Sequence, residues 1–299
     1  MIHEDTSARR RDVHVLNLGA GVQSTTLYLL SMEGRIQKFD CAIFADTQDE
    51  TAETYGHLEW LRSLPCDIPI LVRTKGCLSA DLARSENSTH QRFATIPVFT
   101  SPAEGDTRRK GQMRRQCTKE YKIEVIERTI RREVLGLAPG RPVPKGVTVH
   151  QYIGISWDER SRAADIEFRR FRKNGKPRRG WTCHFPLLAM NGEAAPGWTR
   201  EYCEKVYLPE HVPHAVPRSA CKQCPFHSDA EWNHLKQHPK EWADIVQIDR
   251  ELREPGRIVN RNLDQKLYLH DSCRPIDQVD FERHGQLGFA MECEGGCGL

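Results

Sequence analysis

Short apolar runs alternate with amphipathic stretches along the first half of the chain. Four runs rich in apolar residues have the length of buried strands: residues 13–18, 41–45, 68–72 and 147–155. Three segments carry apolar side chains at helical spacing: residues 27–30, 53–61 and 121–134. Because strands and helices alternate, we expect an α/β fold, a Rossmann-like parallel sheet with helices on both faces.

The pattern changes near residue 210. Residues 211–217 read HVPHAVP and are typical of a linker. A cysteine turn and a helical stretch at residues 232–248 follow. We therefore expect an α/β domain over residues 1–210. Residues 211–299 would form a smaller helical region that ends in a cysteine-containing tail.

The composition is that of a polar chain that still buries a core: of 299 residues, 38% are hydrophobic and 28% are charged. The formal net charge of +3 is too small to indicate a partner. No apolar run approaches the roughly 18 residues of a membrane span, and the N-terminus lacks a signal-peptide core. We therefore expect a cytoplasmic protein without membrane contact. In that compartment, 11 cysteines indicate metal or sulfur chemistry rather than disulfides.

The turn after the first predicted strand has the features of an anion cradle, in which small residues let the backbone approach a phosphate and hydroxyl groups open the helix. Its residues are Gly19, Ala20, Gly21, Gln23, Ser24 and Thr25. An ordinary turn between strand and helix is the alternative. Asp46 and Thr47 end the second strand, and ligands of parallel sheets bind at such carboxyl ends, so they predict part of the same pocket. A helix cap is the alternative for Asp46.

Three cysteines predict a metal centre. Cys221 and Cys224 have the spacing that presents two thiolates to one centre. Cys117 follows a basic run and precedes a predicted helix, and both favour its thiolate form. Three thiolates would hold a 4Fe–4S cluster and leave one iron open. The alternatives are a redox dithiol or a zinc site completed by His227 or a tail cysteine.

Two further cysteines, Cys293 and Cys297, lie among glycines near the end of the chain. A flexible tail can carry a thiolate into and out of a pocket, which a sulfur relay requires. A fourth cluster ligand and half of a zinc knuckle are the other interpretations.

Basic residues gather in two segments. Residues 108–115 precede Cys117, and nine Arg or Lys residues fall between residues 160 and 180. These segments predict contacts to a phosphate backbone or another anionic substrate. A solvated loop is the alternative for the second segment.

Five segments, in this order, resemble the phosphoadenosine-phosphosulfate (PAPS) reductase family of the adenine-nucleotide alpha-hydrolase (PP-loop) superfamily. They are residues 19–24 in place of the PP-loop, 46–55 (DTG…ETY), 121–124 (R-K-V-x-P), 154–160 (G-x-R-x-x-E-S) and 185–201 (P-L…W-T-x-x-D). The resemblance covers most of the chain and implies that residues 1–210 form a PP-loop-type domain. It adds a loop facing the nucleotide phosphates, with Gly154, Ser156, Glu159, Arg160 and Arg162, to the nucleotide-binding residues named above.

Three departures from the family pattern bear on the reaction. Gln23 stands where the PP-loop pyrophosphatases carry Asp, and the reductases also tend to have Gln or Glu there. Gln116 and Cys117 replace the Cys–Cys pair of the cluster-bearing reductases. The tail reads E-C-E-G-G-C-G-L rather than E-C-G-L-H, so Cys293 or Cys297 would match the reductase nucleophile. The three-cysteine arrangement resembles the cluster-dependent thiolases and the enzymes of DNA phosphorothioation.

The resemblance implies an iron–sulfur-dependent sulfurtransferase, in which ATP activates an acceptor oxygen and sulfur then displaces AMP. The alternatives are an adenylyl-sulfate or PAPS reductase that releases sulfite, and a non-catalytic nucleotide- or nucleic-acid-binding module with structural zinc. We expect a 4Fe–4S cluster, ATP or (phospho)adenylyl sulfate, Mg²⁺, a sulfur donor or thiol reductant, and tRNA or DNA as the anionic acceptor; a homodimer stays open. We assign metal binding to Cys117, Cys221 and Cys224, and catalysis to Cys293, Cys297 and Asp46.

Overall fold

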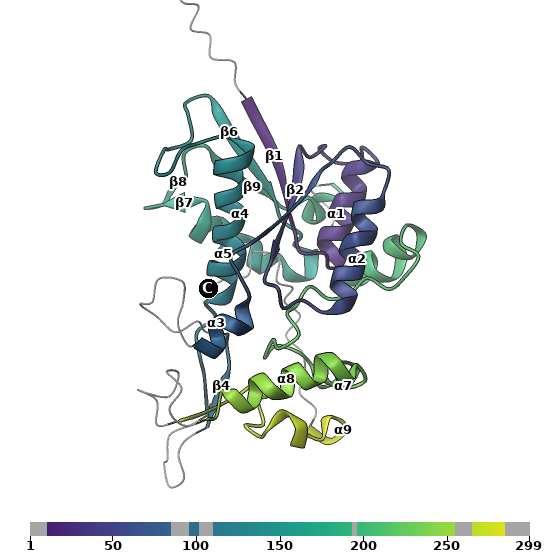
Figure 1. Cartoon of the computed structure of the whole chain (residues 1–299). Coiled ribbons are helices and arrows are strands. Elements are labelled where there is room, and N and C mark those ends of the chain that lie inside the picture. Colours follow the sequence, from purple (N-terminus) through teal and green to yellow (C-terminus); the bar gives the residue numbers. More distant parts are fainter. Residues whose placement is uncertain (1–10, 85–95, 102–109, 193–195, 255–264, 285–299) are drawn as a thin grey trace, which may run out of the picture.

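The computed structural model describes residues 11–84, 96–101, 110–192, 196–254 and 265–284. Its centre is a five-stranded parallel sheet with the strand order β3-β2-β1-β6-β9 (Figure 1). The strands are β1 (Arg11–Leu18), β2 (Cys41–Asp46), β3 (Ile70–Thr74), β6 (Val147–Tyr152) and β9 (Trp181–His184). The predicted α/β fold is confirmed, and the four predicted strands correspond to β1, β2, β3 and β6.

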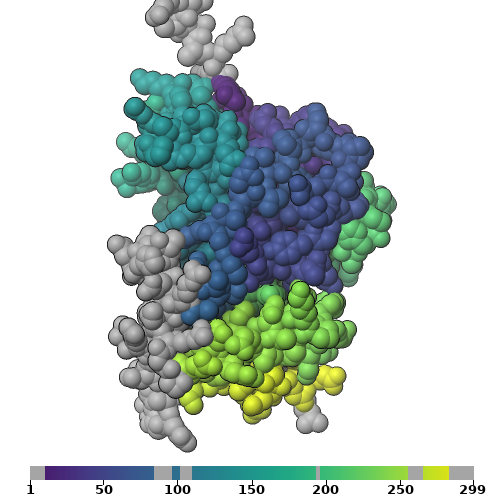
Figure 2. All heavy atoms as spheres, viewed as in Figure 1, coloured from purple at the N-terminus to yellow at the C-terminus, as the bar shows by residue number. Residues whose placement is uncertain are grey.

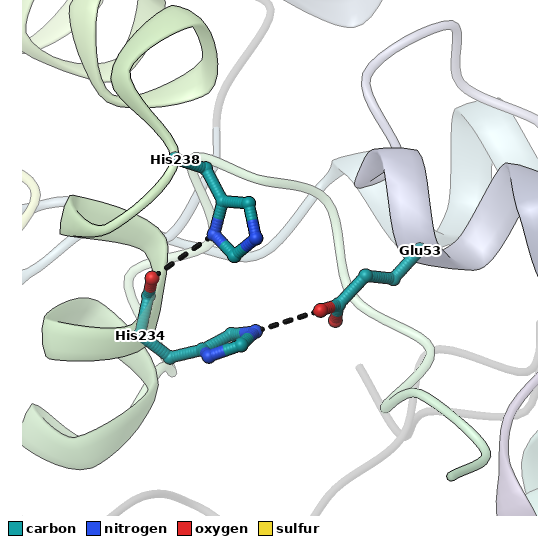
Figure 3. A group of neighbouring side chains, drawn as sticks. All are labelled: Glu53, His234 and His238. Atoms are coloured by element: carbon teal, nitrogen blue, oxygen red, sulfur yellow. Dashed lines mark hydrogen bonds and ion pairs between the residues drawn. The ribbon is translucent and has the colours of Figure 1, made fainter. Parts of the chain in front are cut away.

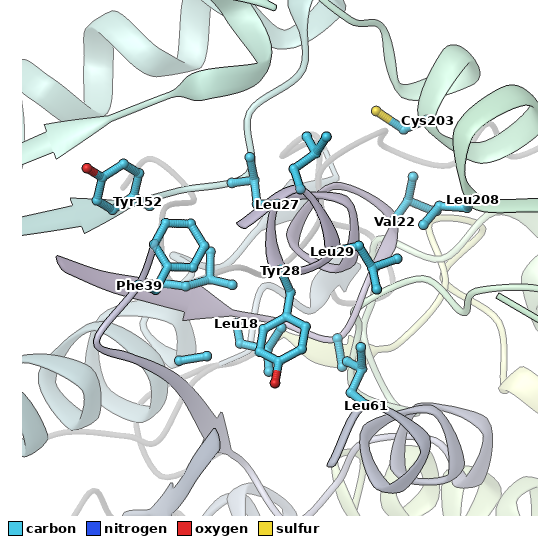
Figure 4. Close-up of a cluster of buried hydrophobic side chains, with 14 of the residues drawn as sticks. Leu18, Val22, Leu27, Tyr28, Leu29, Phe39, Leu61, Tyr152, Cys203 and Leu208 are labelled. Carbon is cyan, nitrogen blue, oxygen red and sulfur yellow. The ribbon is translucent and has the colours of Figure 1, made fainter. Parts of the chain in front are cut away.

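One face of the sheet is covered by α1 (Val22–Met32) and α2 (Ala52–Ser63). Leu18 of β1, Leu27 of α1 and Leu61 of α2 lie in one buried apolar cluster (Figure 4). Burying one such side chain contributes about 1.5–3 kcal/mol. The cluster therefore holds both helices against the strand that positions the turn at residues 19–24.

The other face carries the opposite set of strand residues, because side chains alternate along a strand. Val15 and Ile43 lie there in a second cluster with Ile126 and Ile166. The helices on this face are η1 (Thr118–Ile123), α4 (Glu124–Thr129), η2 (Ile130–Val134) and α5 (Arg160–Arg170). The first three follow one another without a gap, and η1 and η2 are π-helical, so the helix predicted over residues 121–134 is confirmed with an earlier start.

The basic segment after β6 is regular structure rather than a solvated loop. It contains α5 and a hairpin of β7 (Arg172–Lys173) and β8 (Lys176–Pro177), and it leads into β9. Ala163 and Ile166 are the buried residues of α5. Two apolar positions are too few to indicate a helix by their spacing, which is why the sequence did not predict it.

The C-terminal region lies at the edge of the sheet where the strands end (Figure 1). Its helices are α7 (Asp229–Lys236), α8 (Pro239–Glu251), η8 (Ile276–Gln278) and α9 (Phe281–His284). Pro239 opens α8 and so divides the helical stretch predicted over residues 232–248. A small antiparallel sheet joins β10 (Lys266–Tyr268) to β4 (Phe99–Ser101) and β5 (Gly111–Gln112).

A third apolar core lies between this region and the first half of the chain. It contains Trp232 and Ile245 together with Leu78 and Leu82 of α3 (Leu78–Arg84). Figure 2 shows the green and yellow atoms of the C-terminal region directly against the blue atoms of the first half. The core therefore joins segments from both sides of residue 210, and the division into two domains stays a prediction.

The remaining helical segments are single turns or little more. They are η3 (Trp157–Glu159), η4 (Pro186–Ala189), α6 (Arg200–Tyr202), η5 (Cys203–Tyr207) and η6 (Leu208–Glu210). Across the described ranges, no helix has both the length and the apolar character that crossing a membrane requires.

Candidate functional site

The order of the strands reverses at β1. From β1 the chain passes through β2 to β3 on one side, whereas β6 and β9 lie on the other side. In open parallel sheets, ligands bind in the crevice outside the carboxyl ends of the two strands at such a reversal. Two segments predicted to bind nucleotide therefore border this crevice: residues 19–24 after β1 and residues 153–162 after β6.

Ser24 closes the turn after β1. Its Oγ accepts hydrogen bonds from the backbone N–H groups of Gly19 (3.2 Å) and Gly21 (3.3 Å). Ala20 lies between them with a φ of 55°, in the left-handed region that few non-glycine residues adopt. The turn is buried, and it points the positive end of the α1 dipole at the crevice. A phosphate that binds the Gly19 and Gly21 N–H groups would take the place of the Ser24 hydroxyl.

Gln23 links the two loops across the crevice. Its Nε2 donates to Glu159 Oε2 (2.7 Å) and to Ser156 Oγ (3.2 Å), and Glu159 in turn pairs with Arg162. The Gln23 side chain is fully buried, and its Oε1 has no hydrogen-bond partner in the described part of the chain. Leaving a buried amide oxygen without a donor is costly. This oxygen is therefore a position where a ligand hydroxyl or a water would stabilise the site.

The other predicted residues of the two loops lie around this link. Gly154 is buried beyond the end of β6, and Thr25 Oγ1 lies 2.8 Å from His57 Nε2 of α2. Arg160 is exposed, lies 5.3 Å from the Trp157 ring centroid and donates to the Trp157 carbonyl oxygen. Of the two arginines predicted to face phosphates, Arg162 is thus the one tied to the Gln23–Glu159 link.

The loop after β2, residues 46–51, is polar and largely buried. Asp46 Oδ1 accepts hydrogen bonds from Tyr55 Oη and from the Gln48 N–H group, each at 2.8 Å. Burial and the bond to Asp46 raise the pKa of Tyr55. The N-cap of α2 is Thr51, whose side chain accepts a hydrogen bond from the Thr54 N–H group. Asp46 therefore shapes the loop and does not cap the helix.

The cysteine turn at residues 221–224 docks on this loop. Cys221 forms an isolated β-bridge with Glu50 and donates to Glu50 Oε1 through its thiol (3.8 Å). Its Sγ also lies 3.2 Å from Thr47 Oγ1, although the two residues are 174 positions apart. The turn is closed by a 2.9 Å hydrogen bond from the Cys224 N–H group to the Cys221 carbonyl oxygen. The fold thus brings the Cys-x-x-Cys pair to the carboxyl end of β2.

A buried ion pair connects Glu50 to the helix behind Cys117. Lys122 Nζ lies 2.9 Å from Glu50 Oε1, and the two side chains are 5% and 0% exposed. Cys117 is the N-cap residue of η1, the helix that contains Lys122, and it packs against the same apolar cluster as Cys221. The three predicted cysteine ligands therefore belong to segments joined by Glu50 and by the third core.

The spacing of these sulfurs bears on the choice of metal. Among the described residues, Cys117, Cys221 and Cys224 do not form a group whose ligand atoms all lie within 4.8 Å of one another. Zn–S bonds of about 2.3 Å would hold three thiolates closer than that. A 4Fe–4S cluster places irons and sulfides between its thiolates and needs a wider triangle. The donor set, three thiols with no carboxylate among them, suits such a cluster better than a zinc ion.

The alternative zinc ligand and the tail have different outcomes. His227 Nε2 lies 3.0 Å from the Cys221 carbonyl oxygen, so this histidine supports the cysteine turn. Cys293 and Cys297 lie outside the described residues, as do Arg108 and Arg109 of the first basic segment. Their predicted roles stay predictions.

Three contributors to this edge of the sheet were missed from the sequence. They are Glu50, Lys122 and His57, all of which are buried. Lys122 stands between Tyr121 and Ile123 on the apolar face of its helix, and a charged residue in such a position was the available signal. The partner of that charge depends on tertiary contacts and has no signal in the pattern.

Comparisons of the chain with models of protein families, with curated proteins and with solved structures find no match. The resemblance to the PAPS reductase family therefore stays a prediction from five sequence segments. The argument for function rests on that prediction and on the geometry described above.

Proposed function

We propose that this protein is an adenine-nucleotide-dependent sulfurtransferase whose cysteines hold an iron–sulfur cluster. The observation that carries the proposal is the docking of the Cys221–Cys224 turn on residues 46–51. These residues leave the sheet at the same edge as the crevice between β1 and β6. A nucleotide site and a thiol centre on one edge of a sheet are the two components that an activate-then-transfer reaction needs.

The nucleotide phosphates would bind at the N-terminus of α1. The helix dipole favours negative charge there, and Ser24 already holds the turn in the required shape. Arg162, paired with Glu159, supplies a positive charge beside the same crevice. The partnerless Gln23 Oε1 would accept a hydrogen bond from a nucleotide hydroxyl. These contacts would bind and orient ATP.

The reaction we propose conserves oxidation state and has two displacements. An acceptor oxygen attacks the α-phosphorus of ATP, and the bond from that phosphorus to pyrophosphate breaks. A sulfide sulfur then attacks the acceptor atom that bears the oxygen, and the bond to the AMP oxygen breaks. Adenylation is required because an unactivated oxygen is a poor leaving group. The acceptor is an anionic molecule that the basic segments attract, and a nucleic acid fits that description.

Cys117, Cys221 and Cys224 are the residues that would hold the cluster. A bound cluster would supply sulfur-transfer chemistry through an iron that lacks a protein ligand. In the present structure the Cys221 thiol donates to Glu50. Because thiolates rather than thiols bind metals, ligation requires loss of this proton, and the carboxylate lies where it can accept it.

The experiment is anaerobic purification with iron and sulfide quantitation on the wild type and single Cys→Ala variants. Cys117→Ala, Cys221→Ala and Cys224→Ala should each lose the cluster. Cys66→Ala is the matched control, because Cys66 precedes β3 at the opposite edge of the sheet and should retain it. Iron content that is unchanged in one of the three variants contradicts that ligand. Wild-type protein that binds no iron contradicts the cluster altogether.

An adenylyl-sulfate or PAPS reductase is the second candidate, favoured by Gln23 in place of the pyrophosphatase Asp. In that reaction a thiolate attacks the sulfate sulfur, and the adenine nucleotide and finally sulfite are released at the expense of a thiol reductant. The substrate distinguishes the two. Conversion of ATP to AMP and pyrophosphate supports the sulfurtransferase, whereas sulfite release from adenylyl sulfate or PAPS supports the reductase. Nucleotide binding without turnover contradicts both and leaves a binding module.

A further inference from the structure

Three side chains outside the proposed site converge between α2 and the α7–α8 pair. One nitrogen of His234, one of His238 and one carboxylate oxygen of Glu53 all lie within 4.8 Å of one another. Figure 3 shows the imidazoles on the α7–α8 side facing the carboxylate on α2. Within the described ranges this is the one group of three or more potential metal ligands with such spacing.

The local fold explains why the two imidazoles meet. His234 lies in the last turn of α7, and His238 is the N-cap residue of α8. They are four positions apart, which places two side chains on one side of a helical path. Pro239 begins α8 and so sets the direction in which the chain leaves His238. The rings lie 4.8 Å apart, centroid to centroid.

A hydrogen bond fixes the tautomer of His238. Its Nδ1 lies 3.1 Å from the carbonyl oxygen of His234, and a carbonyl can only accept, so Nδ1 carries the hydrogen. The lone pair of His238 is therefore on Nε2. Metal-bound histidines typically use one nitrogen as ligand and donate from the other to a backbone carbonyl, as His238 does here.

The carboxylate is brought to the imidazoles by contacts that do not depend on a metal. Glu53 Oε1 lies 2.8 Å from His234 Nε2. Next to it, the Ala52 N–H group at the start of α2 donates to Glu241 Oε1 of α8 at 2.7 Å. The N-terminus of α2 is thus already docked on α8, and the three ligand atoms are preorganised.

We propose that Glu53, His234 and His238 bind a divalent transition-metal ion, with Zn²⁺ the best match. Two imidazoles and one carboxylate are a known zinc ligand set, and imidazole disfavours Mg²⁺ and Ca²⁺. The side chains of Glu53 and His234 are about half exposed, at 49% and 50%, so water has access to a fourth coordination position. The ion clamps α2 of the sheet layer to α7 and α8 of the C-terminal region. This inference does not depend on the proposed function.

The test is Co²⁺ binding to the full chain, because Co²⁺ reports its ligands through its absorption. Cysteines also bind Co²⁺ but add intense sulfur-to-metal absorption in the near ultraviolet, which a nitrogen–oxygen site lacks. Wild type should bind one equivalent more than Glu53→Gln or His234→Ala, and the lost equivalent should carry no sulfur band. Each variant should weaken this site more than about 10-fold. Glu59→Gln, an exposed carboxylate on the same helix that pairs with Arg62, is the matched control and should keep the site.

A second measurement does not depend on spectra. Zn²⁺ should raise the thermal unfolding midpoint of wild type and Glu59→Gln more than that of Glu53→Gln, because an ion that binds only the folded state stabilises it. Equal Co²⁺ stoichiometry in all four proteins overturns the proposal and leaves an ordinary His–Glu pair. A lost equivalent that carries the sulfur band overturns it as well, because it assigns the ion to cysteines.

Discussion

At the scale of single residues, the chemistry of Gln23 explains a departure from the PP-loop pattern. Its amide nitrogen faces two acceptors, Ser156 Oγ and Glu159 Oε2. An aspartate at position 23 would place a second carboxylate beside Glu159 in a buried site, where like charges repel strongly. The amide replaces that repulsion with two hydrogen bonds. The glutamine is therefore the side chain that this loop pairing requires.

A second residue-scale feature is the buried imidazole of His57, which lies between Thr25 Oγ1 at 2.8 Å and His214 Nε2 at 2.9 Å. Burial disfavours its cation and the neighbouring His214 adds to this, so its pKa is lowered to about 4. Below the unfolded pKa of about 6.5 the unfolded chain binds a proton that the folded protein does not, so stability falls as pH drops. We expect wild type to lose about 2–3 kcal/mol more between pH 7 and pH 4 than His57→Gln.

Urea unfolding at several pH values between 7 and 4 measures this difference. His14 and His184 also have lowered pKa values because of burial, so wild type has further pH dependence that His57→Gln keeps. The comparison of the two proteins removes that shared part. Equal slopes for wild type and His57→Gln would show that His57 keeps its ordinary pKa in the folded protein.

At the scale of elements, the two helical layers differ in how clearly the sequence announces them. α1 and α2 bury periodic apolar residues, whereas α5 buries only Ala163 and Ile166 and is otherwise charged. The stretch over residues 232–248 carries a helical pattern throughout, but Pro239 divides it into α7 and α8. Periodicity thus predicts which residues are helical more reliably than where one helix ends.

Two glycines make a prediction about elements. Gly56 is an exposed position inside α2, and a Cβ added there would meet no atom within 4 Å. Gly56→Ala should therefore raise the free energy of unfolding by about 0.5–1 kcal/mol, because glycine is a poor helix former. At Gly197 an added Cβ would overlap the carbonyl oxygens of Leu187 and Leu188. Gly197→Ala should destabilise the protein by about 1–3 kcal/mol.

Chemical denaturation of the two variants against wild type checks both signs. Gly197 allows the chain to approach η4, where the Trp198 N–H group donates to the Leu187 carbonyl oxygen at 2.8 Å. A stable Gly197→Ala would mean that this contact loosens without loss. A destabilised Gly56→Ala would mean that α2 cannot accept a side chain on its exposed face.

At the scale of the whole molecule, the third core makes the C-terminal region and the α/β layer interdependent. Leu78 and Leu82 pack with Trp232 and Ile245, and β4 pairs with β10 across the same boundary. The cysteine turn adds a further connection through Glu50. The region that holds two of the proposed cluster ligands is thus also part of the support for the loop after β2.

A chain that ends at residue 210 should therefore be much less stable than the full chain. It would expose Leu78, Leu82 and Val98, each of which contributes about 1.5–3 kcal/mol when buried. We expect it to bind a dye for apolar surface and to unfold at lower urea concentration. Cooperative unfolding at the full-length midpoint would instead support residues 1–210 as an independent domain.

The sequence by itself determined the class of fold and the position of the turns at its functional edge. Apolar periodicity is a local property, so β1, β2, β3, β6 and the helix over residues 118–134 could be predicted from it. The Cys-x-x-Cys spacing and the turn at residues 19–24 are also local, and they were visible without the structure.

Only the tertiary structure decided which of these local features meet. Cys221 lies against Thr47 across 174 positions, and Glu53 faces His234 across 181, and no periodic pattern encodes such pairs. The same holds for Gln23 and Glu159, which belong to loops after different strands. Parallel strands bring their carboxyl ends to one edge whatever their separation in the chain. The physical reason is that the composition of a site depends on strand order, which is fixed by packing of the whole sheet and its helices.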